Sequence, residues 1–324
     1  MRDTQHALAL DGVTRRFGDV TALADLSLHV GHGEVVGLLG HNGAGKTTAV
    51  RVLAGLLAAD RGSVRVGDAD PMIDGPAVRQ RLGVLPATPV VDDRLTGRQN
   101  LVFVADVFGI PRAGLVGRID AALATFDLTE RADERVAGYS TGMRQRLALA
   151  RVLLPEPEVF LLDEPTSALD PIAARQVRRS LASLAQASGR TVVLCTHDLS
   201  EAEQLCDRVV VLEHGRIVAD GSPAHLAAQH GTGGVLVEVA PGQVEVARRA
   251  LAALDPSALD VEAAGRIRAR GLSREAVPRL VASLAAEGVD VYEVRRLDPT
   301  LEDVYLALHG RVPGDETISD EATS

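Results

Sequence analysis

Three short segments of this chain carry side chains that can act on phosphate groups. Residues Gly40–Thr48 read GHNGAGKTT and follow the apolar run Val35–Leu39. The pair Asp163-Glu164 ends a second apolar run, and His197 follows a third. Phosphoryl transfer asks a protein mainly for positioning and charge neutralisation, and amides, an ammonium group and carboxylates supply both.

The first segment has the phosphate-binding loop pattern, in which Gly40 and four further residues precede Gly45-Lys46-Thr47. Gly43 and Gly45 allow a tight turn that points backbone amides at phosphate oxygens, in front of the positive end of a helix. Lys46, the only lysine of the chain, supplies a compact cation, and the Thr47 hydroxyl can ligate Mg²⁺. A chance glycine turn is the alternative, and the complete pattern after an apolar strand disfavours it.

The acidic pair has a matching chemistry. Asp163 at the end of a buried strand can hold the Mg²⁺ shell, while Glu164 can take a proton from the attacking water. Alone, such a pair is usually a solvated strand end. The phosphate loop upstream favours the catalytic interpretation.

The elements that must position these groups alternate between strands and helices over residues 33–211, which predicts a mostly parallel sheet covered on both faces. Ligands of such sheets bind at the carboxyl ends of the strands, where Gly40, Asp163 and His197 all fall. Residues 7–30 alternate apolar and polar positions and predict antiparallel strands. The predicted fold class is therefore α/β, with an antiparallel β subdomain.

The chain changes character after Gly221. A β-α-β-β-α-β order over residues 235–310 predicts a small α+β domain with its helices on one face. We expect a first domain over 1–221 with a helical subdomain at about 88–155, and a disordered acidic tail over 311–324. Between the domains we expect a linker over 222–234 that begins with a short helix and continues as a flexible connection.

Composition excludes several classes of protein. The net charge of −10 and the pI near 5.4 argue against a nucleic-acid partner, which needs a basic surface. No apolar run approaches the ~18 residues of a membrane span, and the N-terminal residues are too charged for a signal peptide. Cys195 and Cys206 lack metal-site spacing and are expected to be core residues of a cytosolic protein.

Further segments carry a family resemblance. Residues 139–145 read YSTGMRQ, Asp163 lies in VFLLDEPTSALDP, and residues 195–198 read CTHD. With GHNGAGKTT upstream, their order and spacing closely resemble the ATP-binding cassette (ABC) ATPases over about residues 8–221. The resemblance implies the P-loop fold of these ATPases, with ATP and Mg²⁺ as ligands.

The resemblance also implies roles for individual residues. Asp163 would act with Thr47 near Mg²⁺, Glu164 would be the general base, and His197 would sense the γ-phosphate. Ser140 and Gly142 would contact the nucleotide held by a second copy, and residues 168–170 would cross the dimer interface. The nucleotide itself would be held by Gly40, His41, Asn42, Gly43, Ala44, Gly45, Lys46, Thr47 and Thr48.

Some positions leave alternatives open. Phe17 occupies the position of the aromatic side chain that stacks on adenine, or it is an ordinary core residue. His197 is either the switch residue or a strand-end histidine. Ala87 stands where the family usually has Gln or Glu, and a methyl group cannot ligate Mg²⁺. We hypothesise that the chain still hydrolyses ATP, with Asp163, Glu164 and water completing the metal shell.

The implied function is the ATPase subunit of a transporter that works as a dimer, most simply a homodimer, with a separate integral-membrane permease. Residues 297–310, LDPTLEDVYLALHG, resemble the C-terminal extension of the daunorubicin-type drug exporter branch, which favours export of drug, antibiotic or lipid-like cargo. The subunit would be cytoplasmic, on the inner face of the membrane, with residues 85–100 as the permease contact.

Two rivals belong to other classes. A soluble ABC protein acting on ribosomes or nucleic acid usually has two cassettes or long insertions, which this chain lacks. A small-molecule kinase needs an acceptor pocket rather than a shared dimer interface. The sequence names neither the cargo nor the role of the C-terminal domain.

Overall fold

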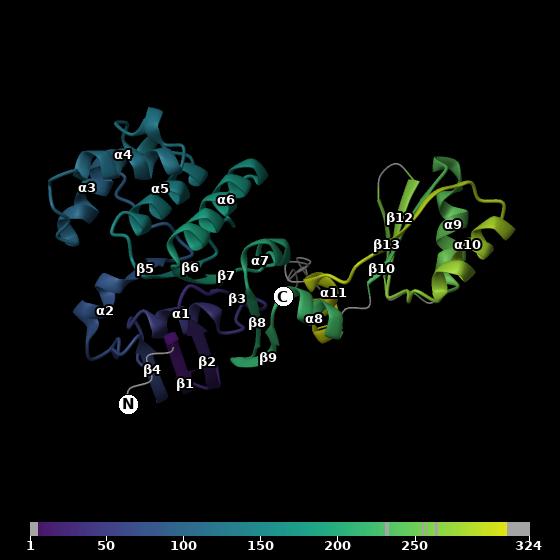
Figure 1. Cartoon of the computed structure of the whole chain (residues 1–324), viewed down its shortest axis with the longest axis horizontal. Coiled ribbons are helices and arrows are strands. Elements are labelled where there is room, and N and C mark those ends of the chain that lie inside the picture. The colour runs from purple at the N-terminus through teal and green to yellow at the C-terminus, as the bar shows by residue number, and fades with distance from the viewer. Residues whose placement is uncertain (1–5, 231–232, 255, 257, 263–264, 310–324) are drawn as a thin grey trace, which may run out of the picture. The chain divides into compact units, whose positions relative to one another are not determined.

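The computed structural model describes residues 6–230, 233–254, 256, 258–262 and 265–309. The predicted acidic tail, 311–324, lies outside the described residues. The chain divides into two compact units, Met1–Asp220 and Gly221–Ser324 (Figure 1).

The centre of the first unit is a six-stranded sheet in the order β5-β6-β7-β3-β8-β9. The register shows that β5, β6, β7, β3 and β8 run parallel. The predicted mostly parallel sheet is therefore confirmed. Its strands are β3 (Val35–Leu39), β5 (Leu82–Leu85), β6 (Val159–Asp163), β7 (Thr191–Cys195), β8 (Arg208–Glu213) and β9 (Arg216–Gly221).

The three central strands are buried along their whole length. The sequences VVGLL in β3, VFLLD in β6 and TVVLC in β7 have every residue buried, as a parallel sheet covered on both faces requires. Because these strands are adjacent and parallel, their carboxyl ends meet at one edge.

A three-stranded antiparallel sheet, β2-β1-β4, forms a second layer. Leu10 and Leu28 of this sheet share one buried cluster with Leu38 of β3 and Leu53 of helix α1. The predicted antiparallel subdomain is thus confirmed. Its strands are β1 (His6–Phe17), β2 (Val20–Gly31) and β4 (Arg61–Val66).

Seven α-helices are described in the first unit, and most begin at a side chain that satisfies their first amides. Thr96 and Gln99 form a complete capping box, and Ser140, Asp170 and Asp198 each accept from amides of the following turn. The helices are α1 (Lys46–Leu53), α2 (Gly75–Arg81), α3 (Gly97–Val107), α4 (Leu115–Thr125), α5 (Thr141–Leu153), α6 (Pro171–Ser188) and α7 (Leu199–Leu205).

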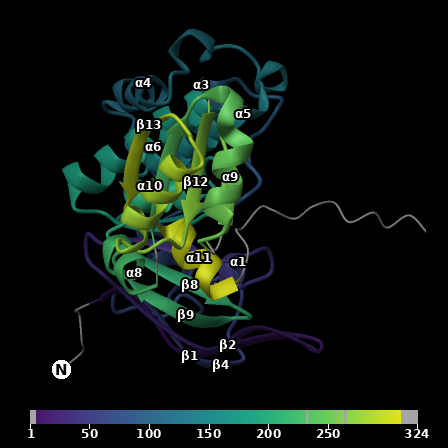
Figure 2. The ribbon, with the colours of Figure 1, turned by 90° about the vertical axis from the view of Figure 1, so that its right-hand side faces the viewer.

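Helices α3, α4 and α5 gather at one end of the first unit. Figures 1 and 2 both show them at the opposite end from β1, β2 and β4, with the parallel sheet between. Arg98 of α3 pairs with Asp120 of α4 and with Asp133 in the segment between α4 and α5.

The second unit contains a four-stranded antiparallel sheet in the order β11-β12-β10-β13. Val235, Val237 and Ile267 of the sheet share a core with Leu251 of α9 and Leu284 of α10. The predicted small α+β part is confirmed. Its core elements are β10 (Gly234–Val239), α9 (Val244–Ala252), β11 (Ala258–Val261), β12 (Arg266–Arg270), α10 (Ala276–Ala286) and β13 (Val291–Leu297).

Residues 222–234, predicted as a linker that begins with a short helix, contain helix α8 (Pro223–His230). This helix packs against α11 (Leu301–His309), and its Leu226 and Ala227 are buried. The segment therefore has a packing partner that is distant in sequence. Among the described residues, no helix combines the length and the hydropathy that a membrane crossing requires.

Candidate functional site

The loop between β3 and α1 depends on its glycines. Gly40, Gly43 and Gly45 have φ of 152°, 85° and 111°, a region that L side chains rarely adopt. A Cβ atom on Gly40 would lie 2.4 Å from the Leu212 carbonyl oxygen, and one on Gly45 would lie 2.6 Å from the Ala22 carbonyl oxygen. The loop therefore requires glycine for both backbone conformation and space.

Lys46 lies inside this loop and is only 7% exposed. Its Nζ donates to the carbonyl oxygens of Gly40 and His41, the second at 3.2 Å. Of the other loop residues, Ala44 and Gly45 are buried, His41, Thr47 and Thr48 are half-buried, and Asn42 and Gly43 are exposed. The ammonium group is thus held at the loop by weak neutral acceptors that a phosphate can replace.

Thr47 of helix α1 forms a hydrogen bond with Asp163 at the end of strand β6. The Thr47 hydroxyl donates to Oδ2 of Asp163 at 2.8 Å, although 116 positions separate the residues. Asp163 is 3% exposed, and burial raises the pKa of its carboxyl while the Thr47 hydrogen bond lowers it. Mg²⁺ is commonly held by one or two carboxylates together with substrate phosphates, and the adjacent hydroxyl and carboxylate oxygens fit such an ion.

Glu164 and His197 form a second pair at the same edge. His197 Nδ1 lies 2.8 Å from Oε2 of Glu164, and this contact raises the pKa of the histidine. The Glu164 amide donates to the Cys195 carbonyl at 2.9 Å, which ties the residue to the end of β7. Glu164 also has a φ of 53°, an uncommon left-handed conformation for a non-glycine residue that is often found at functional sites.

Ser140 and Gly142 begin helix α5. The exposed Ser140 accepts from the Met143 amide at 3.3 Å through Oγ, which leaves the hydroxyl hydrogen available as a donor. A Cβ on Gly142 would lie 3.4 Å from Cδ2 of Leu169. Among the described residues, no hydrogen bond or ion pair joins Ser140 or Gly142 to the phosphate loop. Their contact with a second copy's nucleotide stays a prediction.

Phe17 ends β1 and is 46% exposed, so it is not an ordinary core phenylalanine. The Arg15 guanidinium carbon lies 4.9 Å from the ring centroid, one cation on an otherwise accessible ring. Stacking on adenine stays a prediction, and the exposure of the ring permits it. Ala87 is likewise exposed.

Two buried polar side chains beside the site were not predicted. Gln145 of α5 is 0% exposed and donates to the Pro165 carbonyl at 3.0 Å, next to Glu164. Glu201 of α7 is 0% exposed and accepts from the Thr166 hydroxyl at 2.9 Å. Their positions in the sequence could have indicated them. Gln145 belongs to the YSTGMRQ segment, and Glu201 follows His197 by four residues.

The chain is similar in sequence to known proteins that bind ATP. The sequence profile of the family described as ABC transporter matches residues 23–167. The chain is 39% identical to the daunorubicin resistance ATP-binding protein DrrA3 of Streptomyces coeruleorubidus, over 96% of this chain and 97% of that protein. It is 36% identical to the Nod factor export ATP-binding protein I of Bradyrhizobium diazoefficiens, over 96% and 99%.

A solved structure is also similar. The structure titled as the ATP binding subunit of an ABC transporter has a TM-score of 0.64 and 30% identity, over 69% of this chain and 92% of that one. The resemblance inferred from the motifs is therefore confirmed.

Proposed function

Because the chain belongs to the ABC transporter family of ATP-hydrolysing subunits, we propose that it powers export through a separate membrane permease. The observation that carries this proposal is the meeting of two pairs, Thr47 with Asp163 and Glu164 with His197, at one edge of the sheet beside the phosphate loop. The relatives named for daunorubicin resistance and Nod factor export favour an amphiphilic or lipid-like cargo.

The proposed chemistry is a water attack on the γ-phosphorus of ATP. Lys46 and the loop amides hold the phosphates, and Glu164 accepts a proton from the water. The water oxygen bonds to the γ-phosphorus while the bond to the β–γ bridging oxygen breaks, which gives ADP and inorganic phosphate. His197 holds Glu164 in place and faces the γ-phosphate. Mg²⁺, held by Thr47 and Asp163, would neutralise phosphate charge.

We propose that two copies close around two nucleotides. Ser140 and Gly142 lie at the N-terminus of the 13-residue helix α5, which favours an anion. Each would bind the γ-phosphate held by the other copy, so that ATP becomes part of the interface and hydrolysis reopens it.

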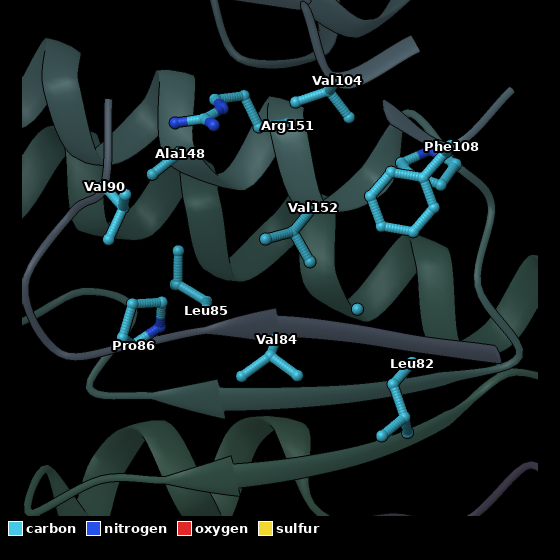
Figure 3. A pocket seen from close by; sticks show the side chains of 12 residues that line it. Leu82, Val84, Leu85, Pro86, Val90, Val104, Phe108, Ala148, Arg151 and Val152 are labelled. Atoms are coloured by element: carbon cyan, nitrogen blue, oxygen red, sulfur yellow. The ribbon is translucent and has the colours of Figure 1, made fainter. Parts of the chain in front are cut away.

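The expected permease contact includes an apolar cavity of ≈ 170 Å³ between β5, α3 and α5. Figure 3 shows Leu85 of β5 on the side of the strand toward Ala148 and Val152 of α5, whereas Leu82 and Val84 lie on the other side. Val90 and Phe108 at this cavity are 65% and 38% exposed. Arg151 also lines the neighbouring cavity, and its Nε is buried without a hydrogen-bond partner among the described residues. These features suit a cytoplasmic segment of a permease that has one apolar face and a carboxylate.

Two measurements test the proposal. The Glu164→Gln variant should form a dimer in light scattering with saturating Mg-ATP, and a persistent monomer would overturn the shared nucleotide site. Capture of the full chain from solubilised membranes should recover a polytopic membrane protein, and Val90→Glu should lose it while Val116→Glu, exposed on α4, retains it. Recovery of ribosomal RNA or DNA in place of the membrane protein would support the rival soluble ABC protein.

A further inference from the structure

Glu201 is a buried carboxyl that the chemistry above does not use. It lies in α7, is 0% exposed, and accepts a 2.9 Å hydrogen bond from the hydroxyl of Thr166, itself 8% exposed. The amide of Glu201 also donates to the capping Asp198 at 3.1 Å. Burying a carboxyl is costly, so its retention beside the candidate site needs an explanation.

The contacts of Glu201 join the two segments that carry the candidate catalytic pair. Thr166 follows Glu164 by two positions, and Glu201 follows His197 by one helical turn. Residues 164–166 and 197–201 therefore make two side-chain contacts with each other. One joins His197 to Glu164 and the other joins Glu201 to Thr166.

The two contacts differ in their exposure to solvent. The His197 side chain is 46% exposed, and contacts of that kind are worth little because water competes for them. The Thr166–Glu201 bond is buried, where removing one partner leaves the other without compensation. Burial raises the pKa of Glu201, and the Thr166 hydrogen bond opposes that rise. Oε2 of Glu201 is buried without a hydrogen-bond partner among the described residues, so the carboxyl is held through Oε1 by Thr166.

We propose that Glu201 is a positioning residue for hydrolysis, which through Thr166 keeps the loop after Glu164 in register with His197. This inference rests on the proposed roles of Glu164 and His197. The loop after Glu164 is held from two helices. Gln145 of α5 donates to the Pro165 carbonyl, and Glu201 of α7 accepts from Thr166. Of these two helices, α7 is the one that follows His197.

The test compares Thr166→Val, which removes the donor, with Thr166→Ser, which keeps it. In single-turnover hydrolysis by the full chain, we expect Thr166→Val to slow the chemical step about tenfold, because small misplacements of catalytic groups are costly. Thr166→Ser should stay within about twofold of the wild type, and the Kd for ATP should be unchanged in both. Glu201→Gln keeps an oxygen acceptor and should also retain the rate.

The His197→Ala background separates positioning from a general structural role. If Glu201 acts through His197, Thr166→Val should slow hydrolysis less than about twofold in that background. The thermal midpoint should fall by the same amount with and without His197. Equal rates for Thr166→Val and Thr166→Ser, or the same tenfold loss in both backgrounds, would overturn the inference. Unchanged hydrolysis in His197→Ala alone would instead remove His197 from the proposed mechanism, and the inference with it.

Discussion

Thr47 and Asp163 are joined by a 2.8 Å hydrogen bond, although Thr47 lies in the first turn of helix α1 and Asp163 ends strand β6. Strand β7 lies between β3, which leads into the phosphate loop, and β6. The contact therefore spans two strand spacings at the carboxyl edge. It brings together two oxygens that suit a Mg²⁺ ion.

The first prediction concerns this contact. Thr47→Val preserves the shape of the side chain and removes its oxygen, so the Mg²⁺ concentration for half-maximal ATP hydrolysis should rise at least tenfold. Thr47→Ser keeps the oxygen and should stay near the wild type. A Mg²⁺ titration of steady-state turnover measures both, and equal midpoints for Val and Ser would exclude Thr47 as a ligand.

Glu164→Gln removes the base but keeps the size of the side chain. Turnover should fall by about 10²–10⁴, the usual contribution of general base catalysis, with ATP binding intact. Glu130→Gln, on an exposed turn, is the matched control and should leave turnover unchanged. Near wild-type turnover in Glu164→Gln would mean that another group accepts the proton.

His197 predicts a pH dependence of stability. Its hydrogen bond with Glu164 raises the pKa of His197 in the folded protein above the unfolded value of about 6.5. The stabilisation is therefore complete below that unfolded value and is lost as pH rises through the raised pKa. Because the side chain is half exposed, we expect about 0.5 kcal/mol or less.

Urea unfolding of the wild type and of His197→Gln at pH 6 and pH 8.5 measures this difference. The free energy of unfolding should differ between the two proteins more at pH 6. A larger difference at pH 8.5 would contradict the assigned direction.

Phe17→Ala should weaken ATP binding by about 5- to 150-fold, because stacking on a base is worth about 1–3 kcal/mol. Affinity for inorganic tripolyphosphate, which has no base, should not change. Val20→Ala, exposed across the same turn, is the control. Isothermal titration with both ligands decides, and an equal loss for both would show that Phe17 acts on the loop and not on adenine.

Ala87→Gln restores an oxygen at a position where the chain has only a methyl group. The variant should need less Mg²⁺ for half-maximal turnover, because its amide oxygen can join the metal shell. Ala87→Leu adds volume without a ligand and serves as the control. If Ala87→Gln leaves both turnover and Mg²⁺ dependence unchanged, the composition of the shell does not depend on this position.

Much of the fold could be predicted because its signals are local. The runs VVGLL, VFLLD and TVVLC can be buried on both faces only in a covered parallel sheet. Thr96, Ser140, Asp170 and Asp198 mark helix starts through contacts within one turn. Helix α2 was not predicted because its seven residues, GPAVRQR, are too few to show a period and no side-chain cap precedes them.

The capping residues before α7 indicate that helix but not the contact that Glu201 makes. Asp198 and Glu201 have the spacing of a reciprocal cap, and Asp198 does accept from the first amides of α7. The Glu201 side chain instead accepts from Thr166, on a loop 35 positions away. The buried Thr166 hydroxyl, which lies outside α7, is the partner of this carboxyl, and the sequence of α7 does not indicate that contact.

The sequence by itself determined the phosphate loop, the acidic pair and the alternation of strands and helices, because each depends on neighbours within a few residues. Only the tertiary structure decided that β7 lies between β3 and β6, that Phe17 is exposed, and that Gln145 and Glu201 hold the loop after Glu164. The physical reason is range. Backbone conformation and capping are fixed by adjacent residues, whereas strand order and the partner of a buried polar group depend on how distant segments pack.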